Sequence, residues 1–148
     1  MAVNKLSEQD FLNNKFFTLW FNNEEKAEVI TASAKSSLES QKLPIAGSMG
    51  KITLVTGAEG SGSLSFYKLI DDTLNQDINN CIKNGKPFTF DLIGEVENKS
   101  KGGTYRVIIE DCQITSFEVL NVDIGSADAM KQEYEFEYNP ENVDIELY

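Results

Sequence analysis

The chain has 148 residues, of which 41% are hydrophobic and 25% are charged. This length and composition predict a single globular domain over residues 1–148 and argue against a disordered or fibrous protein. Thirteen basic residues against 24 acidic residues leave a formal charge of −11. Because such a charge repels phosphate backbones, a protein that binds nucleic acid is not expected.

The chain contains no histidine and only two cysteines, Cys81 and Cys112. Histidine is the usual general base near pH 7 and the most frequent metal ligand, so we expect no catalysis, metal or cofactor. The cysteines lack CxxC spacing, which indicates free, buried thiols in a reducing cytoplasm. The start of the chain is charged and no long apolar run follows, so we expect no signal peptide and no membrane anchor.

The first predicted strand is the aromatic run Phe16–Phe21, which ends in a turn at Asn22 and Asn23. Residues 27–40 then alternate between polar and weakly apolar side chains, a period of two typical of a long strand with one wet face. Residues 61–70 resume the alternation and predict a strand with a face of small polar side chains. The polar positions on these two strands are Thr31, Ser33, Lys35, Ser37, Glu39, Ser61, Ser63 and Ser65.

Between these alternating runs, residues 41–62 contain Pro44 and five glycines without a sustained period, so a long loop is predicted. The loop holds six large apolar residues: Leu43, Ile45, Met49, Ile52, Leu54 and Val55. A monomer would struggle to cover them all, which favours burial against a partner. Gly57–Gly62 lacks the ending of a phosphate-binding loop and is interpreted as a turn with positive φ angles.

One helix is predicted, over roughly residues 72–84, because apolar residues at 70, 74, 78, 81 and 82 fall on one side of it. Asp71 and Asp72 are interpreted as residues that cap this helix rather than as catalytic acids. Strands follow at 87–94, 104–112 and 113–122, with a hairpin tip at 98–103. Residues 133–138 alternate strictly between glutamates and aromatic residues, and the carboxylates are interpreted as a solvated face rather than a cation site.

About seven strands and one helix without a βαβ rhythm predict a mainly β fold, an antiparallel two-sheet sandwich or barrel with one flanking helix. The aromatic residues Phe16, Phe17, Trp20 and Phe21 favour a core strand, but they also leave open a monomeric sandwich that binds a ligand. Small polar strand faces, an apolar loop and strong negative charge suit a closed assembly better. In such an assembly, strands of several subunits join edge to edge.

Several short motifs follow one another along the chain: Ala46-Gly47, Val55-Thr56-Gly57, Gly60, Gly62-Ser63-Leu64, Lys68 and Asn84-Gly85-Lys86. In this order they resemble the tail tube proteins of contractile phages, in particular those of PBSX-like prophages and phage-tail-like bacteriocins. The similarity is strongest over residues 43–87 and extends in element order from Met1–Asn4 to residues 133–138.

The resemblance implies hexameric rings of subunits with the fold of type VI secretion tube proteins, in which hairpins of neighbours form one barrel around a channel. It also implies that rings stack into a tube inside a contractile sheath, with baseplate and tape-measure proteins as further partners. The six apolar loop residues then become candidates for contacts between subunits and rings, and the eight polar positions become candidates for the channel lining. DNA would pass without specific binding, and the subunit would be made in the host cytoplasm and assembled in the particle.

Overall fold

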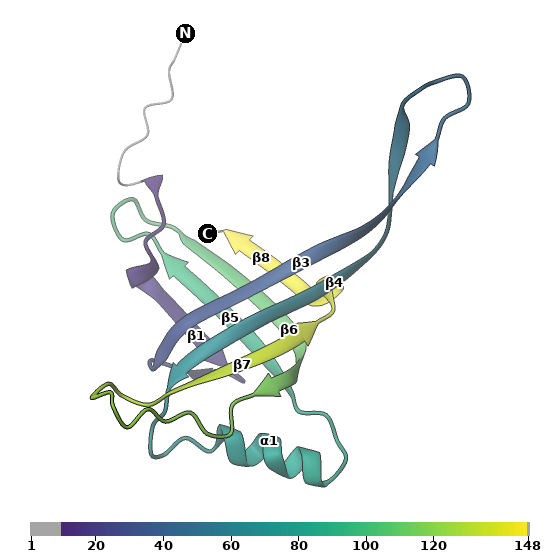
Figure 1. The fold of residues 1–148 in the computed structure, drawn as a ribbon. Helices are drawn as coiled ribbons and strands as arrows, with labels where there is room; N and C mark the ends of the chain where they lie inside the picture. Colours follow the sequence, from purple (N-terminus) through teal and green to yellow (C-terminus); the bar gives the residue numbers. More distant parts are fainter. Residues whose placement is uncertain (1–9, 148) are drawn as a thin grey trace.

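The computed structural model describes residues 10–147, which form eight β-strands and one α-helix (Figure 1). The strands are β1 (Phe17–Phe21), β2 (Glu24–Glu25), β3 (Val29–Pro44), β4 (Lys51–Tyr67), β5 (Thr89–Glu97), β6 (Thr104–Phe117), β7 (Lys131–Tyr138) and β8 (Val143–Leu147). Helix α1 spans Leu74–Lys83, and short 3-10 helices span Asn14–Phe16 and Pro140–Asn142. Met1–Asn4, which contributes to the resemblance, and most of the charged start of the chain lie outside the described residues.

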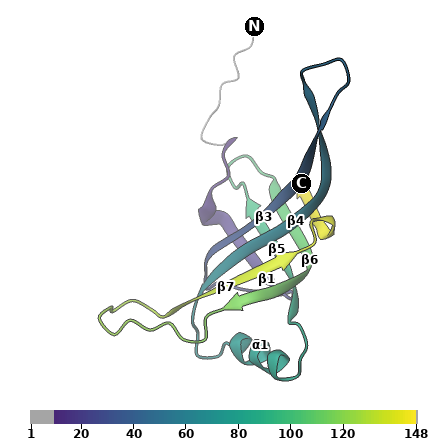
Figure 2. The same ribbon diagram turned by 45° about the vertical axis from the view of Figure 1, so that its right-hand side comes forward.

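The strands form one continuous antiparallel sheet in the order β2-β1-β5-β6-β7-β4-β3, and β8 pairs with β6. Strand β6 joins two layers, because its first part pairs with β5 and β8 and its last residues pair with β7. The layer of β3, β4 and β7 crosses in front of β1 and β5 in Figure 1, and the turned view in Figure 2 agrees. The predicted mainly β, antiparallel fold with one flanking helix is confirmed.

The hydrophobic core lies between the two layers. The Phe21 ring of β1 stacks on Phe90 of β5 with ring centroids 4.4 Å apart, and Phe90 meets Phe136 of β7 edge-on at 5.6 Å. Leu19 and Phe136 are each only 1% exposed. Of the four aromatic residues favoured for the core, Phe21 is buried in it and Phe17 packs against it. Phe16 precedes β1 and is 37% exposed, and Trp20 lies outside the core, so the prediction is correct only in part.

Helix α1 covers one end of the two layers, at the bottom of Figure 1. Its observed bounds agree with the predicted range of 72–84. Thr73 is at the N-cap position without a side-chain capping bond, and the backbone N–H of Leu74 donates instead to Asp72 Oδ1 at 3.0 Å. Only Leu74 and Ile78 are buried, while Ile70 is fully exposed. No helix within residues 10–147 has the length and apolar character needed to span a membrane.

The long loop predicted over residues 41–62 is wrong. Strand β3 continues to Pro44 and β4 begins at Lys51, so only residues 45–50 connect them. A bulge shifts the register between Glu39 and Ser40, and this shift interrupts the period of two that would have marked the segment as a strand. Pro44 is tolerated because it ends an edge strand, where its missing N–H breaks no sheet pairing.

The predicted turn at Gly57–Gly62 is also wrong, because these residues are extended within β4 and none of its glycines has a positive φ. Gly60 and Gly62 pair with Tyr138 and Phe136 of β7. A Cβ at Gly60 would overlap the Tyr138 ring, and one at Gly62 would overlap the Phe136 ring. The glycines are thus required where the aromatic rings of β7 pack directly on the backbone of β4.

Two further differences concern β6 and the end of the chain. The strands predicted at 104–112 and 113–122 form the single strand β6, which ends at Phe117. Asp111, with a φ of +55°, lies in a bulge opposite Asp91, whose Oδ1 accepts the Asp111 N–H at 3.0 Å. Strand β8 was not predicted, because residues 143–147 alternate too briefly to give a clear pattern.

Candidate assembly surfaces

The eight predicted polar positions lie together on one face of the β3–β4 hairpin. Cross-strand partners project from the same side of a sheet, so the register decides which residues share a face. The pairs are Thr31–Ser65, Ser33–Ser63, Lys35–Ser61, Ser37–Glu59 and Glu39–Gly57. The hydroxyl oxygens of Ser33 and Ser63 lie 3.0 Å apart, which brings the two polar rows into direct contact.

Strand β7 adds three glutamates to this surface, which the sequence analysis had assigned only to solvent. The register places them beside the serines of β4 as Glu133–Ser65, Glu135–Ser63 and Glu137–Ser61. We call this surface of β3, β4 and β7 the polar face. Its charged residues are Lys35, Glu39, Glu59, Lys131, Glu133, Glu135 and Glu137. Carboxylates therefore outnumber lysines on the polar face.

Local alternation could not have joined these glutamates to the serines. Residues 133–137 lie about seventy positions after residues 61–65, and only the strand order brings β7 beside β4. The signal that could have found them is the shared period of two, which gives each strand one wet face. The strand order depends on non-local packing, so the period of two cannot predict it.

The carboxylates of Glu39 and Glu59 lie close together on the polar face, where the β3–β4 hairpin leaves the body of the molecule. A hydrogen bond with Glu59, together with its charge, raises the pKa of Glu39 above its ordinary value of 4.5. Both side chains are exposed to solvent. Within residues 10–147, no three acidic or cysteine side chains are grouped as a metal site would require.

The β3–β4 hairpin extends beyond the body of the molecule as an arm, defined here as residues 40–55 (Figure 1). The six apolar residues predicted to need a partner all lie in this arm and all are exposed. Their exposed fractions are 38% for Leu43, 40% for Ile45, 103% for Met49, 56% for Ile52, 47% for Leu54 and 55% for Val55. The segment is a strand hairpin rather than a loop, but its six apolar side chains are exposed in the single chain, as predicted.

Strand β3 also presents a free edge. It stands last in the strand order and pairs with β4 alone among the strands of residues 10–147. Fifteen of its sixteen residues are exposed. A long exposed edge of this kind carries backbone N–H and C=O groups that another strand can pair with.

Comparison with known proteins gives these surfaces a context. The sequence matches the phage tail tube protein family over residues 4–146. The chain belongs to the phage tail tube protein family. The phage-like element PBSX protein XkdM of Bacillus subtilis (strain 168) is 27% identical over 143 residues, which cover 96% of each chain. The resemblance found in the sequence is confirmed.

Solved structures with the same fold include components of an anti-feeding prophage and of an extracellular contractile injection system. The tube-terminating cap of the anti-feeding prophage has a TM-score of 0.79 at 13% identity, over the full length of both chains. A chain of the sheath–tube complex of the extracellular contractile injection system PVC has a TM-score of 0.71 at 14% identity, over 97% of this chain and 99% of that one. These comparisons give no support to the alternative of a monomeric ligand-binding module.

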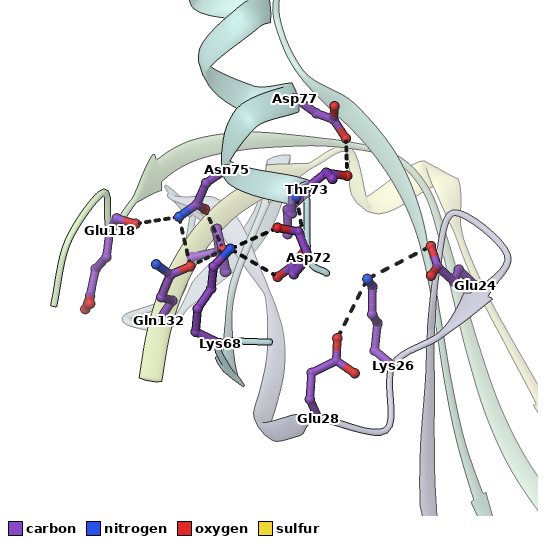
Figure 3. A network of polar contacts seen from close by, with 12 residues as sticks. Glu24, Lys26, Glu28, Lys68, Asp72, Thr73, Asn75, Asp77, Glu118 and Gln132 are labelled. Carbon is purple, nitrogen blue, oxygen red and sulfur yellow. Dashed lines mark hydrogen bonds and ion pairs between the residues drawn. The ribbon is translucent and has the colours of Figure 1, made fainter. Parts of the chain in front are cut away.

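In this tail tube protein, a buried polar network joins helix α1 to the β6–β7 loop, residues 118–130 (Figure 3). Asn75 Nδ2 donates to Gln132 Oε1 at 2.8 Å and to the backbone oxygen of Glu118 at 3.3 Å. The Tyr134 hydroxyl donates to Asn75 Oδ1 at 2.6 Å and lies 2.9 Å from Gln132 Oε1. Burial raises the pKa of Tyr134, so its hydroxyl remains a donor. The network joins the helix to Glu118, the first residue of the loop, and to Gln132 of β7, two residues after its end.

Lys68, one of the motif residues of the tail tube resemblance, holds the end of β4 against the start of α1 (Figure 3). Its Nζ donates to the backbone oxygen of Asp72 at 3.0 Å and lies 3.9 Å from Asp72 Oδ2. Its backbone N–H donates to the oxygen of Met130 at 2.8 Å. Lys68 therefore connects β4, the helix and the end of the β6–β7 loop.

Proposed function

We propose that this chain is the structural subunit of the inner tail tube of a contractile phage tail or phage-tail-like particle. Its copies form rings, hexameric as the resemblance implies, and the rings stack into a channel for DNA ejection or membrane perforation. The observation that carries the proposal is the exposed edge strand β3, with fifteen of its sixteen residues open to solvent. Pairing of this edge with a neighbouring subunit closes the sheet of the ring, which removes the unpaired backbone groups.

The polar face is the face that lines the channel in this proposal. The opposite face of β4 and β7 is already covered, because Leu64, Tyr134 and Phe136 pack against the second layer of the same chain. When strands close into a barrel, one face of the sheet turns inward. The face with serines and glutamates is the one still free to do so.

The charge of the polar face suits a channel for a polyanion. Six chains of −11 give a hexameric ring a formal charge of −66. DNA binds proteins mainly through cations that neutralise its phosphates, and the polar face has few of them. The Debye length is about 8 Å at physiological salt, so repulsion acts close to the wall and prevents adhesion without closing the channel.

The apolar arm supplies contacts between copies, with Leu43, Ile45, Met49, Ile52, Leu54 and Val55 as the contact residues. The structural relatives come from a sheath–tube complex and from tube terminators, which supports a sheath around the tube and other tail components at its ends. Baseplate and tape-measure proteins are the expected partners there. The subunit has a structural rather than a catalytic function, is made in the host cytoplasm and is assembled in the particle.

Negative-stain microscopy combined with size-exclusion chromatography and light scattering tests this function. The purified chain is examined over a hundredfold range of concentration. We expect rings or tubes with an open channel, which appear above a threshold concentration because several weak contacts must form together. A chain that stays monomeric across the whole range, with its β-sheet circular-dichroism signal intact, would contradict the proposal.

A further inference from the structure

Exposed apolar residues gather at two opposite ends of the layer formed by β3, β4 and β7. One group is on the arm, at the end of the hairpin (Figure 1). The other is on the β6–β7 loop, where the exposed fractions are 74% for Val119, 76% for Leu120, 60% for Val122 and 96% for Ile124. Patches of this kind on a soluble protein indicate surfaces that another molecule covers.

The two ends carry opposite charge. Within residues 40–58, the only charged side chains are Lys42 and Lys51, although the whole chain has a charge of −11. The β6–β7 loop contains Glu118, Asp123 and Asp128 and no basic residue. Each of the two segments therefore combines apolar side chains with charges of one sign, and the signs are complementary, although Glu39 precedes the arm and Lys131 follows the loop. Complementary charge of this kind selects the partner and the orientation of a contact.

The arm cannot reach the loop of its own chain. Strand β4 has seventeen residues and runs from the arm to the end of the layer at which the loop lies. At a rise of about 3.3 Å per residue, this strand separates the two surfaces by on the order of 50 Å. Figure 2 shows the arm and the loop pointing away from each other. Only a second copy can bring an arm and a loop together.

A contact between two different surfaces at opposite ends of a molecule leaves one arm and one loop free in every pair. Such a heterologous contact continues from copy to copy, and it forms an open chain unless the rotation between successive copies closes a ring. In the proposed function the β3 edge makes the contact within the ring, so the arm–loop contact is left for copies that stack along the tube. Asn75 of α1 donates to the backbone oxygen of Glu118 at one end of the β6–β7 loop, and the Lys68 N–H donates to the oxygen of Met130 at the other, so the loop presents its apolar residues from a fixed base.

We propose that the arm of one copy docks on the β6–β7 loop of the next copy along the tube. Leu43, Ile45, Met49 and Ile52 cover the apolar residues of that loop, while Lys42 and Lys51 meet Asp123 and Asp128. This inference rests on the proposed tube function and adds the docking partner of the arm. It assigns to residues 118–130 a function that neither the motifs nor the family match describes.

Reversal of the charges tests the docking directly. One variant carries Lys42→Glu with Lys51→Glu, and the other carries Asp123→Lys with Asp128→Lys. Each variant alone opposes like charges in every arm–loop contact, so the concentration needed for tubes rises at least tenfold. An equimolar mixture restores opposite charges when the two variants alternate, and tubes return near the wild-type concentration. The matched control is Lys83→Glu with Lys86→Glu, which makes the same charge change away from both surfaces and shifts the threshold less than twofold.

The outcomes separate this inference from the proposed function. If the wild-type chain forms no tubes, the proposed function fails. If it forms tubes and both charge-reversed variants do so at the same threshold, only the docking inference is overturned. Folded variants that lose assembly and are not restored by mixing overturn it as well.

Crosslinking tests the same contact when a charge-reversed variant does not fold. Met49→Cys and Ile124→Cys are introduced together, with Cys81→Ala, and assembled tubes are treated with a short bifunctional thiol reagent. The proposal predicts a ladder of covalent multimers, because each copy contributes one thiol to each of two contacts. Met49→Cys paired instead with Ile82→Cys, on the exposed side of α1, is the control and should give no ladder. The same short products from both pairs would overturn the docking.

Discussion

The arm and the body of the molecule use the same antiparallel backbone pairing but differ in what covers their side chains. In the body, Tyr134 and Phe136 are each 1% exposed. The Tyr134 ring packs against Phe66, and the Phe136 ring packs against Phe90 and the backbone at Gly62. In the arm, Met49 and Ile52 are 103% and 56% exposed, although both are large and apolar. The body therefore provides the stability of the fold, whereas the arm keeps its apolar surface for contacts with other copies.

Removal of the arm should have the largest effect on assembly. Replacement of Gln41–Val55 by an Asn-Gly turn joins Ser40 to Thr56 near their paired positions in the hairpin. We expect complete loss of tubes in negative-stain images, with an unchanged β-sheet circular-dichroism signal, because the core lies in the body. Loss of the folded signal would assign the arm to the core of the single chain instead.

The next largest effect is expected when positive charge is added to the polar face, which should slow the passage of DNA through the channel. Ser61→Lys, Ser63→Lys and Ser65→Lys together place three cations per subunit beside the passing phosphates, so ejection slows or stops. The measurement is the rate of DNA release from particles that carry the variant. A control with Asn79→Lys, Asn80→Lys and Ser100→Lys adds the same charge on other exposed positions and should eject normally. Normal ejection by the first variant would argue against the channel assignment.

A methyl group on the glycine row of β4 should destabilise the body by a smaller amount. The Cβ of Gly62→Ala would overlap the Phe136 ring and the backbone oxygen of Ser33, and we expect a loss of about 1–3 kcal/mol in the free energy of unfolding. In Gly57→Ala the new Cβ meets only the flexible Glu39 side chain, at 3.3 Å, so a change within about 0.5 kcal/mol is expected. Urea unfolding of both variants measures the difference, and equal stabilities would refute the proposed packing of aromatic rings on β4.

The last prediction is a loss of stability that is confined to alkaline pH. Burial, with the charges of Asp91 and Asp111, raises the pKa of Cys112 from 9.0 to about 12. The unfolded chain releases this proton first, so the contribution of Cys112 is complete below pH 9 and is lost as pH rises toward 12. The slope is at most about 1.4 kcal/mol per pH unit.

Urea unfolding between pH 8 and 11 measures this slope. Cys112→Ala should flatten the decline that begins near pH 9, while Cys81→Ala, at a half-buried position, should leave it in place. A residual decline should begin near pH 10 in Cys112→Ala, because burial also raises the pKa of Tyr134. An unchanged slope in Cys112→Ala would show that this thiol does not control alkaline stability.

The sequence predicted the parts of the fold in which one face of an element packs locally. The helix at 72–84 and the aromatic side of residues 133–138 were found because period and burial coincide there. The arm was missed, because a bulge at Glu39 and Ser40 breaks the alternation and its side chains have no core to face within one chain. Glycines read as turn signals proved to be sites of close ring contact, which depend on β7.

The candidate surfaces were predictable to a similar extent. The eight polar positions share one face, as alternation required, and the apolar residues of the arm are exposed, as their number suggested. The glutamates of β7 and the apolar residues of the β6–β7 loop were missed as parts of assembly surfaces. Their place depends on strand order and on the helix network, both of which join residues far apart in the chain.

The most direct test of the proposed function is a cryo-EM reconstruction of tubes assembled from the complete chain. The proposal predicts that Ser33, Ser63 and Glu135 face the channel and that the outer edge of β3 pairs with a strand of the neighbouring subunit. A tube in which the polar face lies on the outside, or in which β3 remains unpaired, would contradict it.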